Sequence, residues 1–226
     1  MSKLANTLIQ PLSFRRKPGR GVQPDYTHPL LPTYGIKWDE IGNTSNYKPF
    51  VDKYGASLAT TASGTPVFSE TPSGSAIEFT AVTHYLILAA NYGDIFADDD
   101  RASIVFSWEK TDDTLRAHSA FGTDSSSSNR INCHMYYQTS GKIEFQYGTS
   151  PNVEITGLSS QGKHIIALVA YDGIREIWYD GTLAASTSGS SGVSITSTKD
   201  FEFNHKQSTN GDLAKCEFFY VYSESG

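Results

Sequence analysis

Carboxylates at alternate positions of one strand would be the most informative chemical pattern, because they share a face and can flank a glycosidic bond. Two glutamates begin such a pattern, but a residue without a carboxylate follows each at the next alternate position: Gln146 after Glu144 and Trp178 after Glu176. The acids Asp98–Asp100 are contiguous, which is typical of a turn. The sequence therefore argues against glycoside hydrolysis and predicts a protein without catalytic residues.

The sequence also lacks the usual motifs of metal sites, catalytic nucleophiles and nucleotide-binding loops. The six histidines form neither an HxH nor an HExxH pattern. The serine-rich stretches lack a nucleophile elbow, and there is no phosphate-binding loop. Loop carboxylates and amides are ligands that calcium prefers, although polar residues are also the ordinary composition of loops. We therefore expect no cofactor, and the alternative is calcium held by the loop residues Asp124, Asn129, Asn204, Asn210 and Asp212.

Sugar sites combine exposed aromatic faces with groups that form hydrogen bonds. Tyr136, Trp178 and Phe219 fall at positions that can lie on polar faces of their strands, and Asn204 supplies a loop amide. The alternative is that a second sheet or a loop covers these faces. We take Tyr136, Trp178 and Asn204 as the candidate carbohydrate-binding residues.

The composition favours an all-β protein. The chain has 226 residues, of which 12% are aromatic and 19% charged, and Gly, Ser and Thr are abundant. This length is enough to bury a core without disulfide or metal support. No apolar run approaches the roughly 18 residues of a membrane span, so we expect no membrane segment. Cys133 and Cys216 are too few for a disulfide scaffold and are expected to be reduced core residues, with a cross-strand disulfide as the alternative.

Alternation of side-chain types dominates after residue 75 and predicts strands over 103–109, 131–137, 142–147 and 216–222. A hairpin is predicted at 138–141. Sustained helical periodicity is missing, so helices should be few and short.

The region from His164 to Ser186 gives the clearest local signal. The dipeptides Asp172-Gly173 and Asp180-Gly181 each separate β-prone runs, as in two-residue hairpin loops. Three consecutive antiparallel strands are predicted. The run 165–170 is apolar at every position and is predicted to be buried on both faces.

Residues 1–50 differ from the rest of the chain. They hold six of the nine prolines, and residues 1–20 carry a net charge of +5, which leaves −11 on the remainder. Residues 1–14 lack the apolar core of a secretion signal, and the basic cluster at 15–20 lies after them rather than before, so we expect synthesis in a cytoplasm. Residues 1–50 are predicted to be an extended arm that orders against a partner or against its own domain, residues 51–226. The basic residues that would anchor it to an acidic partner are Arg15, Arg16, Lys17 and Arg20. A solvated terminus is the alternative.

Three segments, in the same order, resemble the laminin-G-like branch of the concanavalin A-like lectin/glucanase superfamily. They are Gly74–Phe79 with His84–Leu88, then Ala102–Glu109, then Gly162–Leu183, and Leu213–Tyr222 resembles the closing strand of the family. The resemblance covers about 55–222. It implies a jelly-roll sandwich of two curved antiparallel sheets, and it leaves the function open because the fold hosts lectins, hydrolases and structural modules.

The same resemblance, joined to a basic arm and the lack of an export signal, points to bacteriophage particles, which display modules of this kind. The resulting hypothesis is a non-enzymatic virion protein, a capsid decoration or tail-associated protein. It would be multimeric, anchored to major capsid or tail proteins, and face host-surface glycans. The alternative hypothesis is a carbohydrate-binding lectin module.

Overall fold

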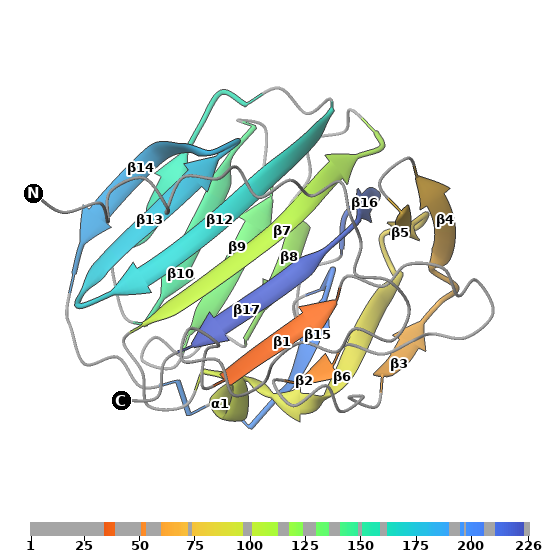
Figure 1. Cartoon of the computed structure of the whole chain (residues 1–226), viewed down its shortest axis with the longest axis horizontal. Coiled ribbons are helices and arrows are strands. Elements are labelled where there is room, and N and C mark those ends of the chain that lie inside the picture. Colours follow the sequence, from red (N-terminus) through yellow and green to blue (C-terminus); the bar gives the residue numbers. More distant parts are fainter. Residues whose placement is uncertain are drawn as a thin grey trace, which may run out of the picture.

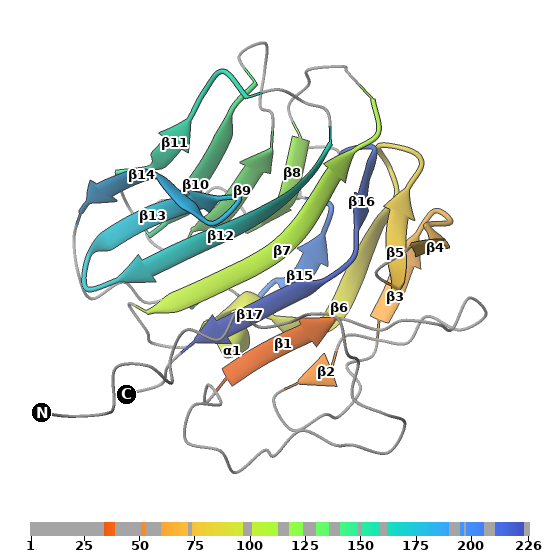
Figure 2. The same ribbon diagram turned by 45° about the horizontal axis from the view of Figure 1, so that its top comes forward.

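The computed structural model describes residues 34–38, 51–52, 60–71, 74–96, 101–112, 118–123, 130–135, 141–148, 151–158, 162–189, 195–196, 198–205 and 211–223. Two antiparallel sheets lie one over the other as a β-sandwich of the jelly-roll kind, as predicted (Figures 1 and 2).

The larger sheet has ten strands. Its main path, in spatial order, is β14 (Thr182–Ser188), β13 (Ile174–Tyr179), β12 (Lys163–Tyr171), β7 (Ala102–Lys110), β16 (Ala214–Cys216), β5 (Gly74–Phe79) and β4 (Val67–Thr71). Beside β7 this sheet continues through β17 (Phe219–Ser223), β1 (Tyr34–Trp38) and β2 (Val51–Asp52).

The smaller sheet has seven strands. Their order is β11 (Val153–Ile155), β10 (Ile143–Tyr147), β9 (Ile131–Met135), β8 (His118–Gly122), β15 (Asp200–Phe203), β6 (Tyr85–Asn91) and β3 (Thr60–Ser63).

One helix, α1 (Tyr92–Ile95), follows β6 in the described part of the chain. The Asn91 side chain caps it by accepting a hydrogen bond from the Asp94 N–H at 2.8 Å. Among the described residues, no helix is long and apolar enough to span a membrane.

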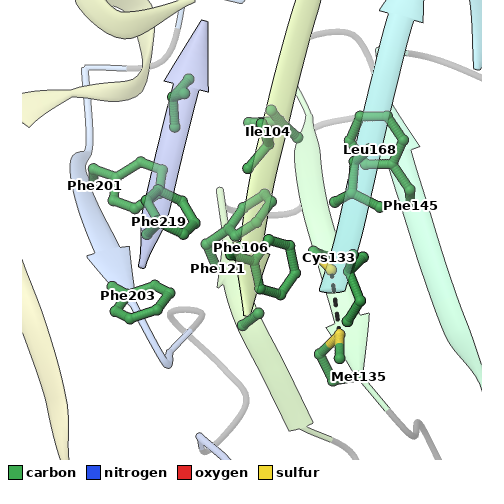
Figure 3. Packing of buried hydrophobic residues seen from close by; sticks show 14 of the residues in the cluster. Ile104, Phe106, Phe121, Cys133, Met135, Phe145, Leu168, Phe201, Phe203 and Phe219 are labelled. Carbon is green, nitrogen blue, oxygen red and sulfur yellow. Dashed lines mark hydrogen bonds between the residues drawn. The ribbon is translucent and has the colours of Figure 1, made fainter. Parts of the chain in front are cut away.

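An aromatic cluster fills the space between the two sheets (Figure 3). The Phe219 ring of β17 lies 4.8 Å from the ring of Phe203 and 5.6 Å from that of Phe201, both on β15 of the opposite sheet. Phe106 and Phe121 join the same cluster. All five rings are fully buried, so Phe219 belongs to the core, and placing it on a polar face was wrong.

Both Asp-Gly hairpins form as predicted. Asp172 and Gly173 have φ values of 45° and 82°, and Asp180 and Gly181 have 50° and 80°. Two successive residues with positive φ are characteristic of the tight turn that suits the twist of paired strands, and glycine adopts this conformation without strain. β12 pairs with β13 and β13 with β14, each antiparallel.

The prediction that both faces of β12 are buried was wrong for one face. Ile166, Leu168 and Ala170 are buried in the core, whereas Ile165 is 44% exposed and Val169 is half-buried. The second sheet covers only one side of β12, so the apolar side chains of its other side remain on the surface.

Part of the predicted arm lies in the larger sheet. β1, within residues 1–50, pairs antiparallel with the closing strand β17 in the register Ile36 opposite Val221. This stretch therefore orders against its own domain, and residues 1–33 lie outside the described residues.

Candidate functional site

The smaller sheet carries a row of polar side chains on the face that points away from the core. Ile131, Cys133 and Met135 of β9 enter the core, so alternation sends Asn132 and His134 to the other face. The same alternation on β10 sends out two further polar residues, Glu144 and Gln146. All four are at most 7% exposed.

Strand register arranges these side chains in two rungs. The first rung crosses four strands in the order Glu154 (β11), Glu144 (β10), His134 (β9) and Ser119 (β8). Directly opposite residues approach closely enough to interact, and Ser119 Oγ and His134 Nδ1 lie 3.1 Å apart.

Glu144 is the most heavily bonded member of the first rung. Lys142 Nζ donates to Glu144 Oε2 at 2.6 Å, and Asn152 Nδ2 donates to Oε1 at 2.9 Å. Gln146 Nε2 also donates to Oε1. Burial opposes the ionisation of Glu144, but the hydrogen bonds and the positive charge of Lys142 outweigh it and hold the pKa below its ordinary value. Glu144 is therefore a fixed anionic acceptor at neutral pH.

The second rung runs from Gln146 through Asn132 to Gly122. Asn132 Nδ2 donates to Gln146 Oε1 at 2.8 Å. Asn132 Oδ1 is buried and accepts no hydrogen bond from any described residue. Leaving a buried carbonyl oxygen without a partner costs about 1–3 kcal/mol, so such atoms are rare in folded proteins.

Together with Asn152, the rungs form a preorganised set of hydrogen-bonding groups: a hydroxyl, an imidazole, three amides and the Glu144 carboxylate. This surface, which we call the polar face, consists of Ser119, Asn132, His134, Glu144, Gln146 and Asn152. Groups of this kind bind a polyhydroxylated ligand, because each ligand hydroxyl can both donate and accept. In the described part of the chain, no cluster of three or more His, Cys, Asp or Glu side chains could hold a metal ion.

Trp178 lies on the opposite side of the sandwich, on the outer face of the larger sheet. Its ring lines an open depression of about 250 Å³ together with Ile165, Ala167 and Val169. Trp178 Nε1 donates to Glu176 Oε2 at 2.8 Å. The depression is almost wholly apolar, so it offers a stacking surface but few hydrogen bonds.

Asn204 does not reach the surface, and its assignment as a sugar contact was wrong. It is fully buried, and its φ of 65° places it in a loop conformation that asparagine tolerates. Its Nδ2 donates to the carbonyls of His84 and Asp212, and its Oδ1 accepts from the Asp212 N–H at 2.8 Å. Both N–H donors of this amide are used within the protein, and its oxygen already accepts one hydrogen bond.

Asp212 also interacts with other buried residues of the protein. Its carboxylate lies 3.2 Å from Lys110 Nζ and 3.4 Å from His118 Nε2, and all three side chains are at most 1% exposed. Both contacts are to Asp212 Oδ1, whereas Oδ2 is buried and accepts no hydrogen bond from a described residue. Burial raises the pKa of Asp212 against the opposing effects of His118 and Lys110.

The other predicted site residues lie outside the described residues. These are Tyr136, the anchoring residues Arg15, Arg16, Lys17 and Arg20, and the calcium candidates Asp124, Asn129 and Asn210. Cys133 and Cys216 are buried and free, consistent with small core residues, and burial raises the pKa of both thiols.

Sequence reasoning missed the polar face. The signal was available, because Asn132, His134, Glu144 and Gln146 are the polar members of two alternating runs joined by a predicted hairpin. Only the hairpin register, with His134 opposite Glu144, shows that they meet on one face.

No family model and no curated protein matches this sequence. Solved structures match in fold. A structure of botulinum neurotoxin type C, described as interacting with two ganglioside molecules, has a TM-score of 0.59 at 12% identity over 84% of this chain and 49% of that chain. The binding domain of Paraclostridial mosquitocidal protein 1 has a TM-score of 0.60 at 9% identity over 87% of this chain and 49% of that chain. This chain therefore spans about half the length of both toxin chains.

A third match is domain 4 of AbnA, an extracellular GH43 arabinanase from Geobacillus stearothermophilus, in complex with arabinotriose. It has a TM-score of 0.59 at 13% identity, with 84% of this chain and 91% of that domain covered. At these identities the likeness shows the fold alone. The chain is an antiparallel β-sandwich of the jelly-roll kind.

Proposed function

We propose that the chain is a non-enzymatic glycan-binding module of the concanavalin A-like, laminin-G-like kind, and that the polar face is its binding site. The observation that carries this proposal is Asn132 Oδ1, a buried acceptor without a hydrogen-bond partner among the described residues. A ligand hydroxyl that donates to this oxygen removes the cost of leaving it unpaired.

The remaining groups of the polar face suit the same ligand. Ser119, His134 and Gln146 lie on three adjacent strands within the width of a sugar ring or two, since neighbouring strands are about 4.8 Å apart. The arabinotriose complex of AbnA domain 4 and the ganglioside interaction of the botulinum structure show that sandwiches of this shape accompany sugar binding, which supports the proposal.

Binding without hydrolysis follows from the charge state of the site. Hydrolysis of a glycosidic bond needs one protonated and one ionised carboxyl group on either side of the bond. Glu144 and Glu154 are the carboxylates of the first rung, and Lys142 Nζ bonds both, at 2.6 and 2.9 Å. The Lys142 ammonium helps to hold the pKa of Glu144 below its ordinary value, so Glu144 does not serve as the acid.

The test is binding of the full chain to an array of oligosaccharides, with two matched variants. Asn132→Leu keeps the branched shape of the side chain and removes the open acceptor, and Trp178→Ala changes the opposite side of the sandwich. We expect the wild type and Trp178→Ala to bind the same glycans and Asn132→Leu to lose at least about ten-fold in affinity. Retained binding in Asn132→Leu, or no binding by the wild type, contradicts the proposal. Tyr136→Ala is expected to weaken binding as well, which tests the prediction for that residue.

Display on a bacteriophage particle is a second candidate function. It is favoured by the charge asymmetry of the sequence, +5 over residues 1–20 against −11 over the rest. Arg15, Arg16, Lys17 and Arg20 would bind acidic residues of major capsid or tail proteins, and many copies on a virion would raise the avidity for host glycans. Deletion of residues 1–20 is then expected to abolish co-sedimentation with particles while leaving the sandwich folded. Full particle occupancy by the truncated chain contradicts this role.

Calcium is not required for binding at the polar face in this account. The array experiment is repeated with a calcium chelator, and unchanged signals are expected. Loss of binding that added calcium restores would instead assign a cation site to the loops that hold Asp124, Asn129 and Asn210.

A further inference from the structure

Arg130 extends the polar face beyond Asn132. The Gly148 N–H donates to the Arg130 carbonyl at 2.7 Å, which continues the register that sets Ile131 opposite Tyr147. Ile131 points into the core, so strand alternation places Arg130 and Asn132 together on the opposite face.

The Arg130 guanidinium has an unused donor. Its Nε is buried and has no hydrogen-bond partner among the described residues, and the side chain is half-buried. A guanidinium stays charged at any physiological pH, and a buried charged donor is stable only when it is paired. The polar face thus holds one unpaired donor at Arg130 and one unpaired acceptor at Asn132, two residues apart, or about 7 Å along the strand.

Glycines flank both groups across the sheet. Gly148 lies opposite Arg130 on the β10 side, and Gly122 lies opposite Asn132 on β8. These positions therefore place no side chain beside Arg130 on the β10 side or beside Asn132 on the β8 side.

The anionic end of the polar face lies away from Arg130. His134, which is opposite Glu144, is four residues from Arg130, or about 13 Å along the strand. Lys142 contacts Glu144 and Glu154 at that end. The charge of Arg130 is thus separated from these carboxylates and remains available to an anion.

We propose that the ligand is an acidic glycan, whose carboxylate pairs with Arg130 while a neighbouring hydroxyl donates to Asn132 Oδ1. The planar guanidinium matches a carboxylate with two parallel hydrogen bonds. This inference rests on glycan binding at the polar face and adds the chemical class of the sugar. Sialic acids and uronic acids both supply the required carboxylate.

The test titrates the full chain with four probes: sialyllactose, a galacturonic acid trisaccharide, and the neutral counterparts lactose and galactotriose. At least one acidic probe is expected to bind about ten-fold more tightly than its neutral counterpart, and the stronger of the two acids identifies the source of the carboxylate.

Three variants assign the effect to Arg130. Arg130→Gln is expected to remove the preference for the acidic probe, whereas Arg130→Lys keeps the charge and part of the preference. Arg101→Gln is the control, because Arg101 pairs with Asp172 at an exposed hairpin of the other sheet. The unfolding midpoint of each variant reports whether it folds.

The outcomes separate the two proposals. Equal binding of acidic and neutral probes, or an acidic preference that persists in Arg130→Gln, overturns the acidic assignment and leaves glycan binding standing. Failure of the wild type to bind any probe overturns the acidic assignment and, together with a blank array, the proposed function.

Discussion

Two asparagines, Asn132 and Asn204, are both 0% exposed but differ in their bonding, and this predicts opposite responses to the same substitution. Asn204 makes three side-chain hydrogen bonds. Truncation to alanine removes about 1 kcal/mol for each bond, and the φ of 65° adds about 1 kcal/mol because alanine disfavours the left-handed region. We therefore expect Asn204→Ala to lower the free energy of unfolding by about 4 kcal/mol.

Asn132 makes one side-chain hydrogen bond, to Gln146, and leaves Oδ1 unpaired. Asn132→Ala loses about 1 kcal/mol of stability with that bond, but it also removes the cost of about 1–3 kcal/mol for burying Oδ1 without a hydrogen-bond partner. The expected loss of stability is at most about 1 kcal/mol, and a gain is consistent with the same reasoning.

Urea unfolding followed by tryptophan fluorescence measures both variants, with the slope of the transition as a check on two-state behaviour. The reasoning predicts a difference of at least about 2 kcal/mol between the two variants. If Asn132→Ala is as destabilising as Asn204→Ala, Asn132 Oδ1 has a partner in the folded protein and the argument for an open acceptor fails.

Three further predictions concern the core, the acid side of the pH range and a turn. Phe219→Ala should cost about 3–5 kcal/mol in urea unfolding, and the half-buried Trp178→Ala should cost less; equal losses would contradict the assignment of the two faces. The lowered pKa of Glu144 means that its charge stabilises the fold above the unfolded-state pKa of about 4.3. That stabilisation is lost as the pH falls through the folded-state pKa. The melting temperature of Glu144→Gln should therefore fall less between pH 6 and pH 3 than that of the wild type. An equal fall in both proteins would contradict a stabilising charge on Glu144. Gly181→Ala should cost about 1 kcal/mol in thermal unfolding through its φ of 80° alone, since no atom lies within 4 Å of the added methyl group; no loss would argue against this turn conformation.

The strands and hairpins could be predicted because their causes are local. Asp172-Gly173 and Asp180-Gly181 fix tight turns through residues that tolerate positive φ. Alternation then assigns one side of each strand to the core, as it does for Phe106 and Phe145.

The errors have tertiary causes. The burial of Asn204 depends on the loop that brings Asp212 and His84 to its amide, residues 8 and 120 positions away in the chain. The outer face of β12 is apolar in sequence, and only the placement of the second sheet shows that Ile165 stays exposed. The polar face needed the register that sets Asn132 opposite Gln146, which alternation alone does not supply.

The most direct test of glycan binding at the polar face is the side-chain amide spectrum of the full, ¹⁵N-labelled chain during titration with the strongest glycan from the array. A hydroxyl that donates to Asn132 Oδ1 changes the electron density of the same amide group, so the Asn132 and Gln146 NH₂ resonances are predicted to shift together in saturable fashion. The Asn204 resonance, from an amide whose two N–H donors are bonded within the protein, is predicted to stay in place. Shifts confined to the Trp178 indole and its neighbours on the larger sheet, with Asn132 unmoved, would contradict the account.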